Sequence, residues 1–220
     1  MRSHRGLLTF LVAFLFCMAV ASMAPAETAK TYYDRGISSY KTGNYQEAIN
    51  SFREAVDIDP DDARSYLAKG KALDRLGRYP EAVDAYKKAI GINPDYSEAY
   101  IGLADTCEEL GLWKAAIKAY KKAVKIDPSN TSAQFALGVA YEKTYRYSRA
   151  IAAYKKVISI NPNDAQAYFR MGAVHAKRGA LKDALKAYQE VLRLKPDDPR
   201  TQRALKDVYR RMSAAKSKSW

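Results

Sequence analysis

Side chains able to carry catalysis or to bind a metal are sparse in this chain. It holds two histidines and two cysteines, of which only His175 and Cys107 lie beyond residue 26. A zinc site needs about four ligands, and a nucleophile needs a base that converges on it in a cleft. One histidine and one cysteine cannot supply either set. We therefore expect no enzyme, no metal site and no cofactor.

Isolated side chains of these types more often pack than react. We expect Cys107 to be a small buried apolar group and His175 to lie between packed helices. A lone cysteine cannot form an internal disulfide, and an intermolecular bridge in an oxidising compartment is the alternative. The glycines lie singly rather than in a loop after a strand, so no phosphate-binding cradle is predicted.

Basic side chains offer a different chemistry, attraction to anions. The chain has 37 Lys and Arg residues against 24 Asp and Glu residues, a net charge of +13. The lysine face, made largely of pairs that follow a tyrosine, consists of Lys87, Lys88, Lys118, Lys121, Lys122, Lys155 and Lys156. It is either simply solvated or attracted to an anionic surface, where each lysine contributes about 1 kcal/mol. Nucleic acid is a weaker interpretation, because no base-stacking platform accompanies the lysines.

The elements that position these residues repeat along the chain. Prolines recur at intervals of 34 residues, at Pro60, Pro94, Pro128, Pro162 and Pro196. Units of this length cannot bury their own apolar faces and must pack on their neighbours. The interval therefore predicts a stack of helical units.

Further columns repeat at the same interval when Ala29 is counted as the first position. The eighth position is glycine or alanine and the twentieth is always alanine, which lets two helices approach closely. Aromatic residues at the fourth and twenty-fourth positions fill the space around that contact. Glycine at the fifteenth position supplies the left-handed conformation that ends the first helix of each unit, and the proline ends the second.

These columns resemble the tetratricopeptide repeat (TPR). The resemblance covers residues 27–198 as five tandem units, which are 29–62, 63–96, 97–130, 131–164 and 165–198. It implies an all-α fold, a right-handed superhelical α-solenoid of five TPR helix pairs plus a C-terminal capping helix. The predicted capping helix spans 199–213, and a basic tail follows at 214–220.

Unit four departs from the repeat pattern at two positions. Tyr145 replaces the glycine of its turn, where a left-handed conformation costs a non-glycine residue roughly 1–2 kcal/mol. Gln134 replaces an aromatic residue at the fourth position. We therefore expect a shifted turn in this unit.

The resemblance also implies a concave groove lined by the first helices, with the second helices and the lysine face on the convex side. The fifth position, which the family exposes in the groove, is apolar in all five units. Apolar anchors with a polar rim are the usual pattern of a binding site, and side chains that only stiffen the helices are the alternative. The predicted peptide-binding groove consists of Tyr33, Ile37, Leu67, Lys71, Ile101, Asp105, Phe135, Val139 and Phe169.

The rim of this groove comes from the ninth, twelfth and thirteenth positions. Its members include Lys71, Asp74, Arg75, Asp105, Glu108, Glu109, Glu142, Lys143 and Lys177. In the third unit the rim is acidic, and Glu98 adds to it. The clamp with which some TPR proteins hold a terminal carboxylate needs a lysine at the fifth position, and none is present.

Residues 1–26 differ from the repeats. Arg2 and Arg5 form a basic start, an apolar run extends from Leu7 to Val20, and small residues lead to Ala26. This is the layout of a signal peptide, with a cut after Ala26 or near Ala19–Ala21. We favour cleavage over an uncleaved membrane anchor, because a spanning helix needs about 20 apolar residues. The repeats are therefore expected outside the cytoplasm, in the periplasm or secreted.

Together these features predict an exported TPR scaffold. It would bind a segment of another protein, a peptide or a helix, in its concave groove and support assembly of an envelope-associated multi-protein complex. The alternative is an adaptor that binds an anionic membrane surface or envelope polymer through the lysine face. A homo-oligomer is left open, and the sequence does not identify the partner.

Overall fold

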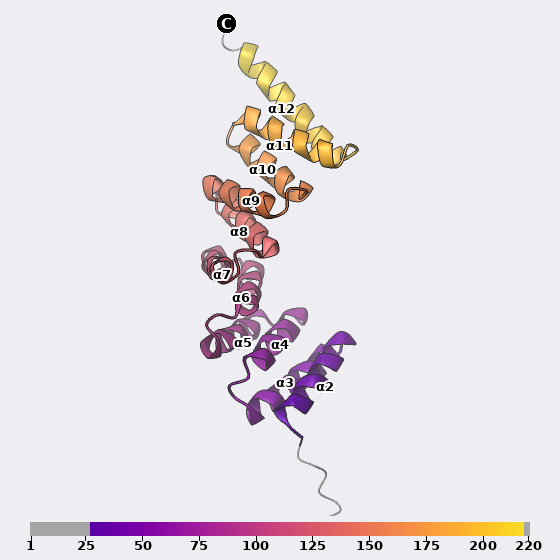
Figure 1. Ribbon diagram of the computed structural model, residues 1–220, viewed down its shortest axis with the longest axis vertical. Helices are drawn as coiled ribbons and strands as arrows, with labels where there is room; N and C mark the ends of the chain where they lie inside the picture. Colours follow the sequence, from indigo (N-terminus) through magenta and orange to yellow (C-terminus); the bar gives the residue numbers. More distant parts are fainter. Residues whose placement is uncertain (1–26, 218–220) are drawn as a thin grey trace, which may run out of the picture.

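The structure is a computed structural model that describes residues 27–217, and this part of the chain forms eleven helices and no strand (Figure 1). The helices are α2 (Ala29–Lys41), α3 (Tyr45–Ile58), α4 (Ala63–Arg75), α5 (Tyr79–Ile92), α6 (Ser97–Glu109), α7 (Trp113–Ile126), α8 (Thr131–Lys143), α9 (Tyr147–Ile160), α10 (Ala165–Lys177), α11 (Leu181–Leu194) and α12 (Pro199–Ser217). Consecutive helices pack as five pairs, and each pair packs on the next. The stack is elongated, with α2 and α12 at opposite ends (Figure 1). The predicted all-α solenoid is confirmed.

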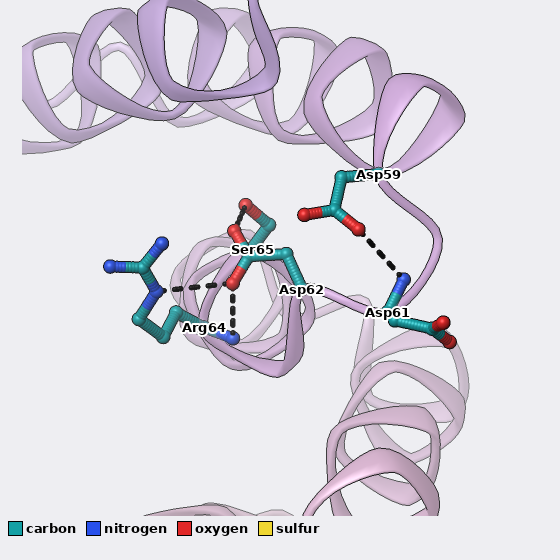
Figure 2. A network of polar contacts seen from close by, with 5 residues as sticks. All are labelled: Asp59, Asp61, Asp62, Arg64 and Ser65. Carbon is teal, nitrogen blue, oxygen red and sulfur yellow. Dashed lines mark hydrogen bonds and ion pairs between the residues drawn. The ribbon is translucent and has the colours of Figure 1, made fainter.

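The junctions between units follow from local polar chemistry, as the one between α3 and α4 shows (Figure 2). Asp59 Oδ1 accepts a hydrogen bond from the backbone N–H of Asp61 at 3.2 Å, which tightens the turn around the proline. Asp62 then caps α4. Its Oδ1 accepts from the backbone N–H of Arg64 at 3.1 Å, and its Oδ2 accepts from Ser65 Oγ at 2.7 Å. The cap satisfies a backbone donor that the first turn of a helix leaves unpaired.

The turns inside the units all use one left-handed residue. Gly43, Gly77, Gly111 and Gly179 have φ between 70° and 83°, and Tyr145 has φ 60° in the same place. The shifted turn predicted for unit four is therefore wrong. The hydrogen bond from Arg146 N to Tyr141 O, 2.8 Å long, matches the bond from Leu112 N to Cys107 O in unit three. The hydrogen bonds that end the helix hold the backbone in the left-handed conformation. Tyr145 therefore adopts it despite the steric cost to a residue with a side chain.

The core is a continuous column of small residues and rings. The five alanines at the twentieth position have no exposed surface. In four of the five units the ring at the twenty-fourth position lies against a glycine, and unit three, with Tyr120, is the exception. A Cβ added at Gly70 or at Gly102 would lie 2.7 or 2.5 Å from the ring of Tyr86. This ring is therefore wedged between α4 and α6 and couples one unit to the next. Gln134 is also buried in unit four.

The last helix, α12, closes the C-terminal end. Its Leu205 and Val208 are buried in one cluster with Tyr188 of α11. The helix continues to Ser217, beyond the predicted end at residue 213. The predicted signal peptide lies outside the described residues, and so does the end of the predicted tail. Between residues 27 and 217, none of the helices combines the length and the apolar character that crossing a bilayer requires.

Candidate partner-binding groove

The first helices of the N-terminal units form a shared hollow. Helix α4 contacts both α2 and α6, and a hollow of about 370 Å³ opens among them. Its lining residues are Tyr40 of α2; Lys71, Asp74 and Arg75 of α4; Tyr86 of α5; and Glu98, Ile101, Gly102 and Asp105 of α6. The structure thus brings together three of the predicted groove residues, Lys71, Ile101 and Asp105.

Asp74 is held in this hollow by two buried hydroxyl groups. Its Oδ2 accepts a hydrogen bond from Tyr86 Oη at 2.5 Å, and its Oδ1 accepts one from Thr106 Oγ1 at 2.8 Å. Loss of hydration raises the pKa of Asp74, and the two hydrogen bonds oppose that rise. The carboxylate therefore ties α4 to α5 and α6, and its position does not depend on a ligand.

Exposed polar groups form the edges of the hollow. Lys71 Nζ lies 3.4 Å from Glu98 Oε2, and Arg75 Nε donates a hydrogen bond to Tyr40 Oη at 3.2 Å. An exposed ion pair such as that of Lys71 and Glu98 contributes about 1 kcal/mol or less. The groups at the edge can therefore exchange these partners for those of a bound segment at little cost.

Beside the hollow, α6 carries a cluster of carboxylates. Tyr120 Oη donates a hydrogen bond to Asp105 Oδ1. Burial, together with the negative charge of Asp105, raises the pKa of Glu108 to about 7. Within the part of the chain that the structure describes, Glu108 Oε1 is buried and has no hydrogen-bond partner. The acidic rim predicted in unit three is thus a set of closely interacting carboxylates.

The rest of the predicted groove does not form one exposed apolar row. Leu67 is only 4% exposed and belongs to the core, which corrects the expectation of an exposed side chain there. Tyr33, Phe135 and Phe169 are partly buried, because each ring packs on the twenty-fourth-position ring of its own unit at centroid distances of 5.5 to 5.9 Å. The row is therefore interrupted at Leu67, and its three aromatic members are partly covered by the twenty-fourth-position rings on which they pack.

Other partners cover parts of this row. The guanidinium of Arg64 lies 5.5 Å from the centre of the Tyr33 ring, and that of Arg200 lies 5.2 Å from the centre of the Phe169 ring. Ile37 is partly buried against the core cluster of the N-terminal units, and Val139 against that of the middle units. None of these residues lines the hollow that contains Lys71.

On the first helices, two residues of the hollow were missed by sequence reasoning. Tyr40 stands at the twelfth position of unit one, where units two to four have an acidic residue. Gly102 stands at the sixth position, where other units have larger side chains. Both residues depart from the repeat column, and that departure was visible in the sequence. Whether they line a hollow depends on the side chains that face them from neighbouring units.

The two residues singled out for reactivity are packed. Cys107 is 4% exposed, and burial raises the pKa of its thiol. His175 Nδ1 is buried without a hydrogen-bond partner among residues 27–217 and lies 3.9 Å from Asp183 Oδ2. Burial lowers the pKa of this imidazole. Over the same residues, no group of three or more His, Cys, Asp or Glu side chains could hold a metal ion.

Stacked helix pairs with a hollow on their first helices define a class of protein, the α-solenoid scaffolds. Comparison of sequences gives the family. A model described as tetratricopeptide repeat matches residues 33–97 and 135–199, and one described as TPR repeat matches residues 104–144. The chain belongs to the tetratricopeptide repeat family. No curated protein matches it in sequence.

Solved structures of TPR proteins resemble this chain closely in fold. A crystal structure of MamA is 26% identical, covers 79% of this chain and 95% of its own, and has a TM-score of 0.73. MamA from Desulfovibrio magneticus RS-1 is 22% identical, with 80% and 99% covered and a TM-score of 0.72. YrrB, described as a TPR protein with an unusual peptide-binding site, is 21% identical, with 87% and 97% covered and a TM-score of 0.73.

Proposed function

We propose that this protein is a scaffold that holds a segment of a partner protein in the hollow between α2, α4 and α6. The observation that carries the proposal is the hollow itself, where Ile101 offers an apolar contact between the charged side chains of Lys71 and Asp105. Recessed sites of this kind, with a few convergent polar groups, are the usual binding sites of proteins. The description of YrrB as having a peptide-binding site adds support at the level of the shared fold.

The character of the hollow favours a segment with basic side chains. Carboxylates of Asp74, Glu98 and Asp105 line it, and Glu108 lies beside it on the same helix. Hydrogen bonds from buried hydroxyl groups already position Asp74 and Asp105. Groups ordered before binding spare the entropy of ordering them on binding, which raises affinity.

The setting proposed for this function lies outside the cytoplasm, in the assembly of a multi-protein complex of the cell envelope. It is supported by the sequence of residues 1–26, with its basic start, apolar run and small residues before Ala26. Fractionation of the native host tests this part. Recovery of the protein with cytoplasmic markers would contradict it.

Site-specific photocrosslinking tests the hollow directly. We expect a crosslinker at position 101 to form an adduct with a discrete partner in the native host. A crosslinker at Ala152, exposed on α9, is the matched control and should not give that adduct. An additional Asp105→Asn change should reduce the yield at position 101, because it removes a charge that the basic segment would contact. Identical adducts from both positions, or none from position 101, would contradict the proposal.

The adaptor function, binding to an anionic membrane surface or envelope polymer, has weaker support. The seven residues of the lysine face are exposed, as expected for such a surface. Exposed lysines are, however, equally expected on any solvated helix. This function therefore ranks behind binding in the hollow.

A further inference from the structure

A second hollow lies on the side of the second helices, at unit three. Helices α5 and α7 both pack on α6 and leave a trough of about 710 Å³ between them. Its apolar lining, which defines the unit-three trough, includes Val83, Ile90, Leu103, Cys107, Leu112 and Ala115. The trough is separate from the concave hollow and does not depend on the function proposed for it.

One small side chain, that of Cys107, lines the trough. Cys107 stands at the eleventh position of its unit, where units two and four have Leu73 and Tyr141. In unit four the Tyr141 ring is buried, and Arg149 lies over it at 5.9 Å. A thiol in place of a leucine or a tyrosine leaves the corresponding space in unit three unfilled.

The exposed edge of unit three is also unusually apolar. At the nineteenth position the other four units carry a charged residue, and unit three carries Ala115. At the sixteenth position units two and four carry Arg78 and Arg146, whereas unit three carries Leu112, which is 53% exposed. An exposed leucine contributes little to the stability of a monomer, and grouped exposed apolar residues mark an interaction site.

The equivalent place in unit five serves as an internal comparison. A hollow of about 290 Å³ lies there between α9, α10 and α11, with Met171 and His175 on α10. Asp183 and Glu190 stand where the unit-three trough has Ala115 and Lys122. The same geometry therefore occurs twice, and only the copy in unit three is apolar with basic edges.

Basic side chains run along one edge of the trough and continue beyond it. Lys118 and Lys122 line both the trough and a neighbouring cleft of about 360 Å³ between α7 and α9. The other basic residues of this cleft are Lys114, Lys121, Lys125, Arg146 and Arg149. The cleft has no acidic lining, and across residues 27–217 none of these seven side chains forms an ion pair. On the opposite edge, Lys87 Nζ lies 3.9 Å from Asp84 Oδ1.

We propose that the unit-three trough and the adjoining cleft bind an acidic, amphipathic helix of a partner protein. Its apolar side chains would lie between α5 and α7, and its carboxylates would face the unpaired lysines and arginines of α7 and α9. Charge complementarity selects this occupant, because the apolar floor and the basic edge lie side by side on one surface.

The openness of the trough favours a helix over a lipid. Leu110 and Leu112 at its rim are 37% and 53% exposed, so an acyl chain in the trough would remain partly in water. An amphipathic helix covers the open side with its own polar face. Because α5 and α7 have 14 residues each, about 21 Å, a helix of roughly 18 residues, about 27 Å, follows the whole trough and extends about one turn beyond it.

The test uses a synthetic helical peptide of about 18 residues, roughly five turns, with leucine along one face and glutamate on its flanks. We expect saturable binding to the protein by fluorescence anisotropy. Ala115→Glu restores the charge that units one and two carry at this position, and we expect it to weaken binding at least about tenfold. Lys118→Glu should have a similar effect. Lys186→Glu, at the same position in unit five, is the matched control and should leave binding unchanged.

Two further probes separate the competing explanations. A scrambled peptide of the same composition should bind far more weakly, and equal binding would overturn the proposal by showing attraction of charge alone. Vesicles of phosphatidylglycerol test the membrane as occupant. The proposal is overturned if Ala115→Glu abolishes vesicle binding while the helical peptide does not bind. Circular dichroism should show that Ala115→Glu keeps its helix content, because residue 115 is exposed on α7.

Discussion

At the scale of single residues, Tyr145 shows the backbone overriding a side chain's preference. It adopts the left-handed conformation that glycine supplies in the other four turns, and it is 79% exposed. Its ring meets that of Tyr147 edge-on, at a centroid distance of 6.1 Å. The helix-ending hydrogen bonds that require this conformation are kept in full.

We expect Tyr145→Gly to stabilise the protein by about 1 kcal/mol, because the left-handed conformation is unstrained in glycine. Urea unfolding measures the change. Tyr145→Ala is the control, because alanine removes the ring and keeps the strain. An equal gain from both variants would show that the ring, not the backbone, is the source of the instability.

Glu108 should make stability depend on pH. Its pKa is raised to about 7 by burial, so between about pH 4.5 and pH 7 the folded state holds a proton that the unfolded state has lost. This group therefore lowers the stability as the pH rises through that window. We expect Glu108→Gln to be more stable than the parent above pH 7, by on the order of 1–3 kcal/mol, and to lose this advantage below about pH 4.5.

Urea unfolding at pH 4 and at pH 8 measures this difference. Glu109→Gln is the matched control, because the neighbouring side chain is exposed and should change the stability little. A Glu108→Gln variant whose advantage is the same at both pH values would contradict the assignment.

At the scale of the helices, α12 decides whether the C-terminal end of the stack is closed. Leu205 is 8% exposed and lies in one cluster with Tyr188. We expect Leu205→Ala to destabilise the protein by about 2–4 kcal/mol, through lost burial and the cavity that remains. Since units contact only their neighbours, Leu205→Ala should speed hydrogen exchange of the amides in α11 and α12. It should leave exchange in α4 and α6 nearly unchanged.

Hydrogen exchange followed helix by helix measures the effect. Lys206→Ala, at an exposed neighbouring position, should change little. Uniformly faster exchange along the whole chain would show instead that the stack unfolds as one cooperative unit.

At the scale of the whole molecule, stability is distributed along the stack. Across residues 27–217, helices of one unit contact that unit and its neighbours, and no central core joins the two ends of the stack. We expect a fragment of residues 97–220, three units with their cap, to fold, because about three repeats are needed for stability. A fragment of residues 165–198, a single unit, should remain unfolded. Circular dichroism and thermal melting distinguish these outcomes, and a folded single unit would contradict this account.

The two sides of the stack also differ in charge. The hollow on the first helices is rich in carboxylates near unit three, whereas α7 and α9 present unpaired lysines and arginines on the other side. One chain could therefore hold a basic segment on one side and an acidic helix on the other. Both sites involve unit three, which supplies α6 to the hollow and α6 and α7 to the trough.

The sequence alone determined the repeat and the ends of its helices. Proline at Pro60, glycine at Gly111 and aspartate at Asp62 act through their own backbone geometry and hydrogen bonds, which are local and can be inferred without a fold. The TPR family and its five helix pairs were predicted from the resemblance of the repeated columns, and both are confirmed. The burial of Cys107, expected of an isolated cysteine, is confirmed as well. The groove assignment as a binding site and the export signal stay predictions.

The tertiary structure decided which members of a repeat column are exposed. Leu67 and Ile101 occupy the same position in successive units, yet Leu67 is buried and Ile101 lines a hollow. The trough at Cys107 likewise depends on α5 and α7, which lie on either side of this side chain. Exposure depends on the volumes of side chains that neighbouring units bring together, and no single column of the sequence contains that information.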